Sequence, residues 1–263
     1  MTEGATGRLR GRSALVTGAS RLSGIGAAVC RALAAEGAGI AFTHFRAYDR
    51  RFPWAGAEDE PARLEAELRA HGVRALAIEA DLADPATPER VLDRVEAEFG
   101  PLRILVNNAA FSTNDGFAAL DAVTLDAHYA VNVRAMALLS VGFARRYPAE
   151  PGGRIINFSS GQGRGPMPDE LAYAASKGAV EAFTVSLSPA VAPLGITVNA
   201  VNPGPTDTGW IGPDLARELL PKFPFGRLGA PEDAARLVAW LASDDAAWIT
   251  GQIINSEGGF IRR

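Results

Sequence analysis

The sequence of 263 residues contains a single cysteine, Cys30, and only three histidines. It therefore lacks a cysteine pair for an internal disulfide and shows no zinc-ligand spacing, so we expect no metal site and a reducing, cytoplasmic setting. An excess of basic charge is also missing, because 26 Lys and Arg residues face 30 Asp and Glu residues, a formal net charge of −4. This balance argues against nucleic-acid binding, which needs a basic stripe to neutralise phosphates.

An uninterrupted apolar run of membrane-spanning length is lacking as well. The uncharged stretch 182–206 is long enough, but Pro189, Pro193 and Pro203 would break a membrane helix. Near the start of the chain, the apolar stretch Ala14–Val16 is too short for a signal-peptide core. With 48% hydrophobic and 21% charged residues, the composition instead predicts a folded chain with a sizeable buried core and no membrane segment.

Short β-branched runs alternate with longer amphipathic stretches along the whole chain, which is typical of βαβ units around a parallel sheet. The predicted strands are Ala14–Thr17, Gly39–Thr43, Arg74–Glu79, Ile104–Asn107, Arg154–Phe158, Thr197–Val201 and Gln252–Asn255. The predicted helices are Ile25–Glu36, Glu60–His71, Pro88–Phe99, Leu125–Tyr147, Ala172–Val191 and Pro231–Ala242. No linker or repeat divides the chain. We therefore predict one α/β domain over residues 1–263, with a doubly wound parallel sheet of about seven strands and helices on both faces.

Two irregular segments interrupt this alternation. Residues 45–59 are rich in arginine and aromatic side chains, and residues 206–227 are broken by glycine and proline. Long structureless loops are uncommon in compact domains unless they serve a function. We expect both at the carboxyl edge of the sheet, where open α/β sheets bind ligands. Segment 206–227 is a candidate substrate lid, although its apolar side chains could equally pack against the body of the protein.

A glycine-rich loop joins the first predicted strand to the first predicted helix. Gly18 follows the strand, and Gly24-Ile25-Gly26 opens the helix. Glycines let the backbone approach a pyrophosphate, and the helix N-terminus offers unpaired N–H groups with a partial positive charge. The alternative is an ordinary tight turn, because a glycine pattern on its own is a weak signal.

A second group of residues points to proton transfer. Tyr173 and Lys177 lie four residues apart and hence on one face of a helix. A nearby ammonium favours the phenolate and lowers the tyrosine pKa toward neutrality, as proton exchange with a carbonyl or alcohol requires. Ser160 follows a predicted strand and is placed to reach the same cleft. A partly exposed Tyr and Lys on a surface helix is the alternative.

Taken in order, these motifs resemble those of the short-chain dehydrogenase/reductase superfamily over nearly the whole chain, and their overall look is similar to 3-oxoacyl-carrier-protein reductases. The resemblance rests on Thr17-Gly18, Gly24-Ile25-Gly26, Asp81-Leu82, Asn107-Asn108-Ala109-Ala110, Asn132, Ser160, Tyr173 with Lys177, Asn202-Pro203-Gly204 and Ile249-Thr250-Gly251-Gln252. It implies a Rossmann-like domain that carries NAD(P) and moves a hydride between the nicotinamide and a carbonyl or alcohol carbon. It also suggests a homotetramer.

The resemblance also implies a role for each site residue. Tyr173 would be the acid/base, Lys177 would lower its pKa and bind the nicotinamide ribose, and Ser160 would orient the substrate oxygen. Asn132 would hold a water that relays protons to Lys177. The implied cofactor shell comprises the glycine loop, Asp81, Leu82, Asn108, Ala109, Ala110, Pro203, Gly204, Thr206 and Thr208. Ordinary turns, caps and strand ends are the alternatives for these shell residues.

The glycine loop departs from the family pattern, because five residues, Ala19 to Ser23, separate its first two glycines, two more than usual. Ser20, Arg21 or Ser23 could thus face the adenosine ribose. An Asp or Glu at the end of the second strand would favour NAD, and none is found there. Arg21 and Arg46 could instead bind a 2′-phosphate, which favours NADP over NAD; the alternative is solvated surface charge.

We therefore predict an NAD(P)-dependent enzyme that interconverts a ketone and a secondary alcohol, acting on a small-molecule substrate. We expect the pocket to be shaped by Phe111, Ser112, Gly161, Gln162, Met167, Trp210 and Phe223. An enoyl reductase is disfavoured, because enoyl-reductase relatives resemble a pattern in which more residues separate the tyrosine from the lysine than the four seen here. One alternative is a non-catalytic dinucleotide-binding scaffold or sensor, which is expected to have lost the tyrosine, lysine or serine. A lyase or epimerase with the same Tyr and Lys pair is another, but that branch resembles longer chains with an added domain.

Overall fold

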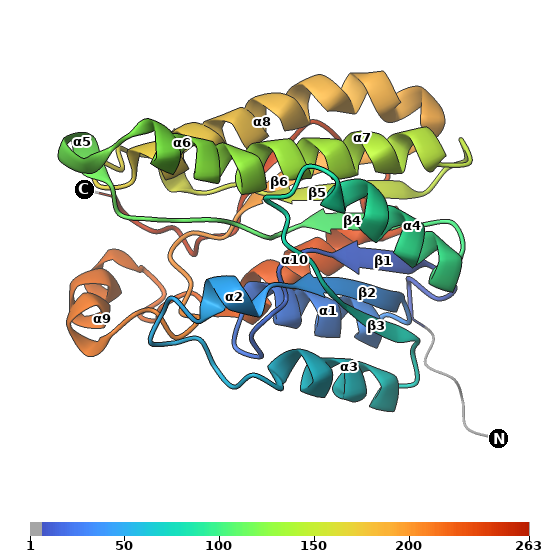
Figure 1. Ribbon diagram of the computed structural model, residues 1–263, viewed down its shortest axis with the longest axis horizontal. Coiled ribbons are helices and arrows are strands. Elements are labelled where there is room, and N and C mark those ends of the chain that lie inside the picture. Colours follow the sequence, from blue (N-terminus) through green and yellow to red (C-terminus); the bar gives the residue numbers. More distant parts are fainter. Residues whose placement is uncertain (1–6, 263) are drawn as a thin grey trace.

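The computed structural model describes residues 7–262. Its centre is one seven-stranded parallel sheet in the order β3-β2-β1-β4-β5-β6-β7 (Figure 1). The strands are β1 Ser13–Val16, β2 Gly39–His44, β3 Ala75–Glu79, β4 Ile104–Asn107, β5 Gly153–Phe158, β6 Ile196–Asn202 and β7 Ile253–Asn255. The strand order reverses between β1 and β4, and a doubly wound sheet binds its ligand at such a switch point. The predicted fold class is confirmed.

Helices cover both faces of this sheet (Figure 1). The longer ones are α1 Ile25–Ala35, α3 Glu60–Ala70, α4 Thr87–Phe99, α7 Met136–Arg146, α8 Leu171–Val191 and α10 Pro231–Ala242. Helices α1, α3 and α10 share one hydrophobic core with the sheet, and α4, α7 and α8 contribute to a second core. Because each face is covered, strands β1, β4, β5 and β6 are buried along their whole length, which explains why their sequences are not alternating.

The predicted elements agree with the structure to within one residue at each end, with one exception. The long helix predicted over Leu125–Tyr147 is three segments: α6 Ala122–His128, a π-helix η1 over Tyr129–Ala135, and α7. A π-helix carries one extra residue per turn, and such insertions occur frequently at functional sites. Here the insertion contains the buried Asn132.

The two irregular segments contain short helices that the sequence did not predict. Helix α2 (Arg46–Asp49) follows β2, and α9 (Pro213–Leu219) follows β6; a further short helix, α5, spans Gly116–Ala119. In Figure 1, α2 and α9 lie at the carboxyl end of the strands, as expected for segments next to a binding site. The lid role of residues 206–227 stays a prediction.

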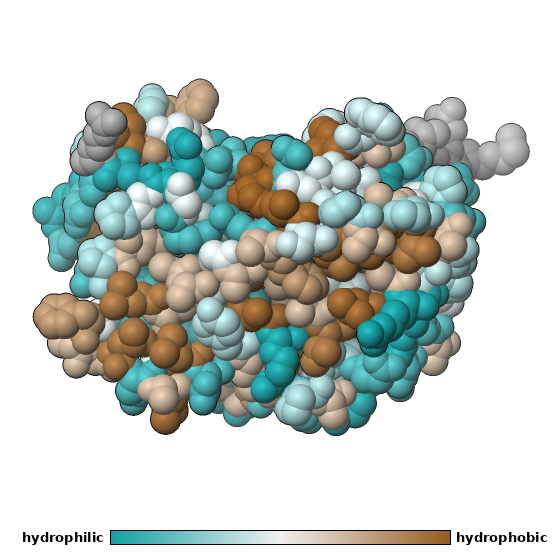
Figure 2. Space-filling model, turned by 90° about the horizontal axis from the view of Figure 1, so that it is seen from above, coloured by the Kyte–Doolittle hydropathy of each residue, from teal (hydrophilic) through white to brown (hydrophobic). Residues whose placement is uncertain are grey.

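Apolar surface gathers over the face made by α7 and α8 (Figure 2). Leu138 on α7 and Val185 on α8 are large hydrophobic side chains with 44% and 51% of their surface exposed. Over residues 7–262, no helix is both long and apolar enough to cross a membrane.

Candidate active site

The loop between β1 and α1 has the geometry of a phosphate cradle. Gly18 adopts a φ of +74°, and a Cβ there would lie 2.6 Å from the Cα of Ala109. A Cβ on Gly26 would lie 2.5 Å from the carbonyl oxygen of Gly18. Helix α1 begins directly after Gly24, and no side chain among the described residues caps its first N–H groups. The glycines are therefore required by space and conformation, and the free N–H groups are available to an anion.

Hydrogen bonds join this loop to the end of β4. The Thr17 hydroxyl accepts from the backbone N–H groups of Asn108 and Ala109, each at 3.0 Å. The Asn108 side-chain amide donates to the carbonyls of Thr17 and Gly18, each at 2.9 Å. Asn108 therefore fixes the shape of the cradle through its own side chain. These bonds hold the two strands at the switch point in register.

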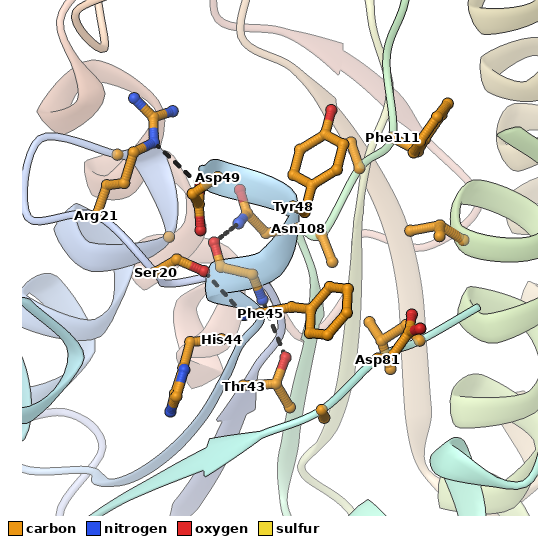
Figure 3. Close-up of a pocket in the computed structure, with 18 of the residues that line it drawn as sticks. Ser20, Arg21, Thr43, His44, Phe45, Tyr48, Asp49, Asp81, Asn108 and Phe111 are labelled. Atoms are coloured by element: carbon orange, nitrogen blue, oxygen red, sulfur yellow. Dashed lines mark hydrogen bonds and ion pairs between the residues drawn. The ribbon is translucent and has the colours of Figure 1, made fainter. Parts of the chain in front are cut away.

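A cavity of about 410 Å³ opens beside the cradle (Figure 3). Many residues of the predicted cofactor shell line it: Gly18, Ser20, Arg21, Gly24, Ile25, Gly26, Asp81, Leu82, Asn108, Ala109, Ala110 and Thr208. Of the residues that we expected to shape the substrate pocket, Phe111 lines this cavity too. Asp81 also accepts a bond from the Ala83 N–H at 2.9 Å, so it stabilises a turn while it faces the cavity. Size and lining suit the adenosine half of a dinucleotide.

Other predicted shell residues lie outside the lining of this cavity. The Thr206 hydroxyl donates to the Gly204 carbonyl at 3.2 Å, within the turn that begins at Pro203. Gly204 has a φ of +63°, and a Cβ there would lie 2.5 Å from the Cβ of Glu257. The turn is thus closed on itself and packed against the C-terminal segment, at the end of β6.

Arg46 does not face the cavity, contrary to the predicted contact with a 2′-phosphate. Its side chain is 4% exposed. Its guanidinium donates to the carbonyls of Ala55 and Gly56 at 2.8 and 3.0 Å. Arg46 is the first residue of α2, which begins two positions after the last residue of β2. Its side chain folds back into the 45–59 segment, where the carbonyls of Ala55 and Gly56 need donors. Arg46 therefore stabilises this segment.

Five residues of the same segment line the cavity and were not predicted as site residues: Phe45, Ala47, Tyr48, Asp49 and Arg51. The Tyr48 hydroxyl accepts from the Ser112 N–H at 3.1 Å, which ties α2 to the chain after β4. The Arg51 guanidinium lies over the rings of Tyr48 and Phe111, 5.4 and 5.1 Å from their centroids. The arginine- and aromatic-rich composition was the only sequence signal for this arrangement.

The predicted catalytic residues lie outside the lining of this cavity and gather around the start of α8. The Lys177 ammonium lies 5.5 Å from the centroid of the Tyr173 ring and donates to the Phe158 carbonyl at 2.8 Å. The Asn132 amide donates to the Ser176 hydroxyl at 2.9 Å, and its oxygen accepts from the Phe111 N–H at 2.7 Å. These bonds tie the π-helix, the end of β4 and helix α8 into one rigid unit.

The pKa values at this end follow burial rather than the Tyr–Lys pairing. Burial raises the pKa of Tyr173 to about 12, with the Ser160 hydroxyl acting in the opposite direction. Burial lowers the pKa of Lys177 to about 8. We expected Lys177 to bring the tyrosine pKa toward neutrality, but burial raises this pKa and Lys177 is not among the groups that shift it. At neutral pH Tyr173 carries its proton and can donate it.

An aromatic row runs from the cavity to Tyr173. The buried His128 ring lies 4.9 Å from that of Phe111 and 6.4 Å from that of Tyr173. Phe111 in turn lies 5.5 Å from Tyr48. Its neighbours make Phe111 the boundary between the cavity and the catalytic residues.

Among the other expected pocket residues, Phe223 is 5% exposed and packs on Phe260 at 4.9 Å, so it lies against the body of the protein. Trp210 is 40% exposed and donates to the Thr206 carbonyl at 2.8 Å. Gly161, Gln162 and Met167 lie outside the lining of the 410 Å³ cavity. Gly161 faces Arg262 instead, since a Cβ there would lie 2.5 Å from that guanidinium. Within the described part of the chain, no group of His, Cys, Asp and Glu side chains is placed to hold a metal.

Comparison with known proteins agrees with this geometry. The model of a family described as Enoyl-(Acyl carrier protein) reductase matches residues 18–261. The chain is 52% identical to the uncharacterized oxidoreductase YjdA of Bacillus subtilis (strain 168) over 95% of its length and 96% of that protein. It is 34% identical to a 3-oxoacyl-[acyl-carrier-protein] reductase of Staphylococcus aureus (strain Mu50 / ATCC 700699), over 94% of this chain and 97% of that one.

Solved structures of short-chain dehydrogenases and related proteins also match this chain over nearly its whole length. A short-chain dehydrogenase from Burkholderia cenocepacia J2315 in complex with NADP superimposes with a TM-score of 0.85 at 38% identity, covering 96% of this chain and 98% of that one. A blue fluorescent protein from a metagenomic library in complex with NADPH gives 0.85 at 36% identity, covering 96% and 99%. The chain belongs to the short-chain dehydrogenase/reductase superfamily. It is an oxidoreductase of this class.

Proposed function

We propose that this protein is an NADP(H)-dependent reductase that converts a ketone to a secondary alcohol. The observation that carries the proposal is the position of the Lys177 ammonium, 5.5 Å from the centroid of the Tyr173 ring, in a chain that also forms a phosphate cradle between β1 and α1. A phenol with its proton at neutral pH is the group that carbonyl reduction requires, because the product oxygen must receive a proton.

The residues at the cradle fit a bound dinucleotide. Gly18 and Gly26 leave room that a Cβ would fill, and the start of α1 offers N–H groups to a pyrophosphate. Arg21 is the cation at the cavity that lies within the glycine loop. NADP or NADPH is bound in the two solved relatives described above, which supports NADP(H) here, with NAD(H) as the alternative. The bound dinucleotide would supply the hydride.

This chain's own residues supply the remaining steps. Ser160 hydrogen-bonds the substrate oxygen, and Tyr173 donates its phenolic proton to that oxygen as the carbonyl carbon is reduced. The Lys177 ammonium, held by the Phe158 carbonyl, stabilises the phenolate that remains. Asn132 fixes the position of α8 through Ser176. In our proposal the substrate enters from the side of the 206–227 segment.

A second candidate function is reduction of a conjugated C=C bond, which the description of the matching family model favours. The four-residue separation of Tyr173 and Lys177 favours reduction of a carbonyl group over reduction of a C=C bond. We also propose that the apolar face over α7 and α8 is buried in a homo-oligomer, consistent with the tetramer that the resemblance suggests.

The test has two steps. The purified protein is titrated with NADPH and with NADH while the nicotinamide fluorescence is recorded. Matched panels of ketones and enones are then added, and loss of this fluorescence reports oxidation of the dinucleotide. We expect tight NADPH binding and ketone-dependent oxidation, with an alcohol as product. Oxidation with saturation of the C=C bond would establish the second candidate. Nucleotide binding without turnover of any compound would favour a non-catalytic sensor, and binding of neither nucleotide would contradict the proposal.

A further inference from the structure

The C-terminal segment, residues 257–262, follows β7 and lies on the same side of the molecule as α9 (Figure 1). Its backbone is tied to the candidate lid, because the Ile261 N–H donates to the Lys222 carbonyl at 2.9 Å. The ring of Phe260 packs on that of Phe223, with centroids 4.9 Å apart. These contacts hold the C-terminal segment against the end of the candidate lid.

Glu257, at the start of this segment, is a buried carboxylate with partners from three parts of the chain. Its Oε2 accepts from the Arg262 guanidinium at 2.5 Å and from the Asn202 side-chain amide at 2.9 Å. Its Oε1 lies 3.4 Å from Nε of Arg164. Burial acts to raise the pKa of Glu257, but the hydrogen bonds and charges of these partners outweigh burial and hold the pKa below its ordinary value. Glu257 is therefore ionised at neutral pH.

On one side, Glu257 holds the turn that follows β6. The Asn202 side chain, which donates to Glu257, also accepts from the Gly204 N–H at 3.0 Å. The backbone of the turn lies directly against the carboxylate side chain, because a Cβ on Gly204 would lie 2.5 Å from the Cβ of Glu257. This turn contains Pro203 and Gly204, which belong to the predicted cofactor shell. A displacement of Glu257 would therefore displace the turn.

On the other side, Arg262 packs against the loop that follows Ser160. A Cβ on Gly161 would lie 2.5 Å from Nη2 of Arg262, and a Cβ on Gly165 would lie 3.0 Å from its Cδ. The Arg262 side chain is 17% exposed, and its guanidinium lies 5.1 Å from the centroid of the Phe260 ring. Because Gly161 directly follows Ser160, Arg262 limits the movement of the backbone next to this serine.

Resting on the proposed function, we propose that the Glu257–Arg262 ion pair is a positioning device that sets the distance between the hydride donor and the carbonyl carbon. The turn at Pro203 and Gly204 supports the nicotinamide end of the dinucleotide, and Ser160 holds the carbonyl oxygen. The ion pair joins these two supports through one buried carboxylate. A displacement of about 1 Å between reacting groups can lower a rate about a hundredfold, so the pair acts on the hydride step.

A purely stabilising role of the ion pair is the alternative. Removal of one partner from a buried pair destabilises the fold, whatever the pair does for the reaction. The two roles differ in the folded protein saturated with its ligands. A stabilising role changes only the fraction of folded chains, whereas a positioning role lowers the rate constant of the hydride step itself.

The experiment measures NADPH oxidation in a single turnover, with the full chain saturated with NADPH and with a ketone from the panel. Arg262→Gln should lower the rate constant about tenfold, while the dissociation constant for NADPH stays within about threefold of the native value. Arg262→Lys keeps a cation for Glu257 and should recover part of the loss. Arg236→Gln is the matched control, since Arg236 is an exposed arginine that also binds a carboxylate at 2.5 Å, that of Asp233.

A double-mutant cycle tests whether the two residues act as one unit. If they do, the combination of Glu257→Gln with Arg262→Gln should be no slower than the slower single variant. Losses that multiply would overturn the proposal, and so would a native rate constant in Arg262→Gln. If Glu257→Gln does not fold, the single variants of Arg262 still decide the question.

Hydrogen exchange of the ligand-free chain, followed by mass spectrometry, needs no substrate. Arg262→Gln should speed exchange both in residues 161–165 and in residues 202–206, because the pair holds both segments. Faster exchange confined to the C-terminal segment would overturn the proposal. If the native protein oxidises NADPH with no ketone, the proposed function fails, and hydrogen exchange still shows whether the pair joins the two segments.

Discussion

The catalytic end, around the start of α8, and the adenosine end, at the cavity beside the cradle, are built differently. At the catalytic end, the side chains stand on the 21-residue helix α8 and on the π-helix, and the polar groups of Asn132 and Ser176 are bonded within the protein. At the adenosine end, Arg21 and Asp49 come from a lengthened loop and a four-residue helix, and one oxygen of Asp49 has no hydrogen-bond partner within residues 7–262. Long elements thus carry the proposed catalytic side chains, and short segments carry charged side chains that line the cavity.

The largest effect is expected from Tyr173→Phe, which removes only the transferable proton. The turnover number should fall about a thousandfold or more, because general acid catalysis contributes about 10²–10⁴-fold. The dissociation constant for NADPH should stay within about twofold of the native value. That result would separate dinucleotide binding from proton transfer. Steady-state kinetics and fluorescence titration measure the two quantities. Tyr129→Phe, on an exposed tyrosine of the π-helix, is the control, and turnover of Tyr173→Phe within tenfold of native would contradict the assignment.

Lys177→Met should stabilise the ligand-free protein while abolishing turnover. Burial lowers the Lys177 pKa from 10.5 to about 8, so below pH 8 the folded chain holds a desolvated charge that the unfolded chain does not. Removing this charge should raise the free energy of unfolding by about 1–3 kcal/mol at pH 7. Loss of the hydrogen bond to the Phe158 carbonyl reduces this gain.

That stabilisation has a defined pH dependence. Between pH 8 and 10.5 the unfolded chain binds more protons at this lysine, so the stability of the native protein rises with pH. The advantage of Lys177→Met should therefore shrink over this range. Urea unfolding at several pH values measures it, with Lys222→Met on the surface as control. A constant difference across this range would show that Lys177 is not desolvated.

Gly26→Ala tests the cradle at the adenosine end. The new Cβ would lie 2.5 Å from the Gly18 carbonyl oxygen and 2.8 Å from the Asn108 amide, so the loop must shift. Affinity for NADPH and NADH should fall together by about tenfold, because both carry the pyrophosphate. Gly212→Ala, with nothing within 4 Å of its Cβ, should leave binding unchanged. A selective loss of one dinucleotide in Gly26→Ala would argue against a shared pyrophosphate site.

The smallest effect is expected from Arg46→Lys. An ammonium keeps the charge beside Asp49 but cannot donate in the same geometry to both the Ala55 and Gly56 carbonyls. Stability should fall by about 1 kcal/mol, with faster proteolysis in the 45–59 segment. The NADPH to NADH ratio should change by less than about threefold. A tenfold loss confined to NADPH would restore Arg46 as the phosphate ligand.

The sequence predicted the sheet well, and the helix that carries Tyr173 and Lys177, for physical reasons. Fully buried strands and amphipathic helices carry strong periodic signals, and the Tyr173 to Lys177 spacing is fixed by the helix turn itself. The π-helix at Asn132 was missed, because residues 125–147 were taken as one continuous α-helix. Burial of Tyr173, which raises its pKa, depends on neighbours that are distant in sequence and is not visible in the Tyr–Lys spacing.

The adenosine end was predicted less completely. The cradle glycines were found, but the direction of Arg46 and the arrival of Asp49 in the cavity depend on how residues 45–59 fold. This segment has no apolar period, and its conformation is decided by hydrogen bonds such as those from Arg46 to Ala55 and Gly56. Sequence distance from the end of β2 was therefore a poor guide to which side chain faces the cavity.

The most direct test of the account is transfer of deuterium from NADPH deuterated at nicotinamide C4 to a ketone that the panel identifies as substrate, with the product examined by mass spectrometry and NMR. The account predicts that the native protein places the deuterium on the carbinol carbon of one stereoisomer of the alcohol, and that Tyr173→Phe forms no such product. Oxidation of the dinucleotide without deuterium on the carbinol carbon would contradict it.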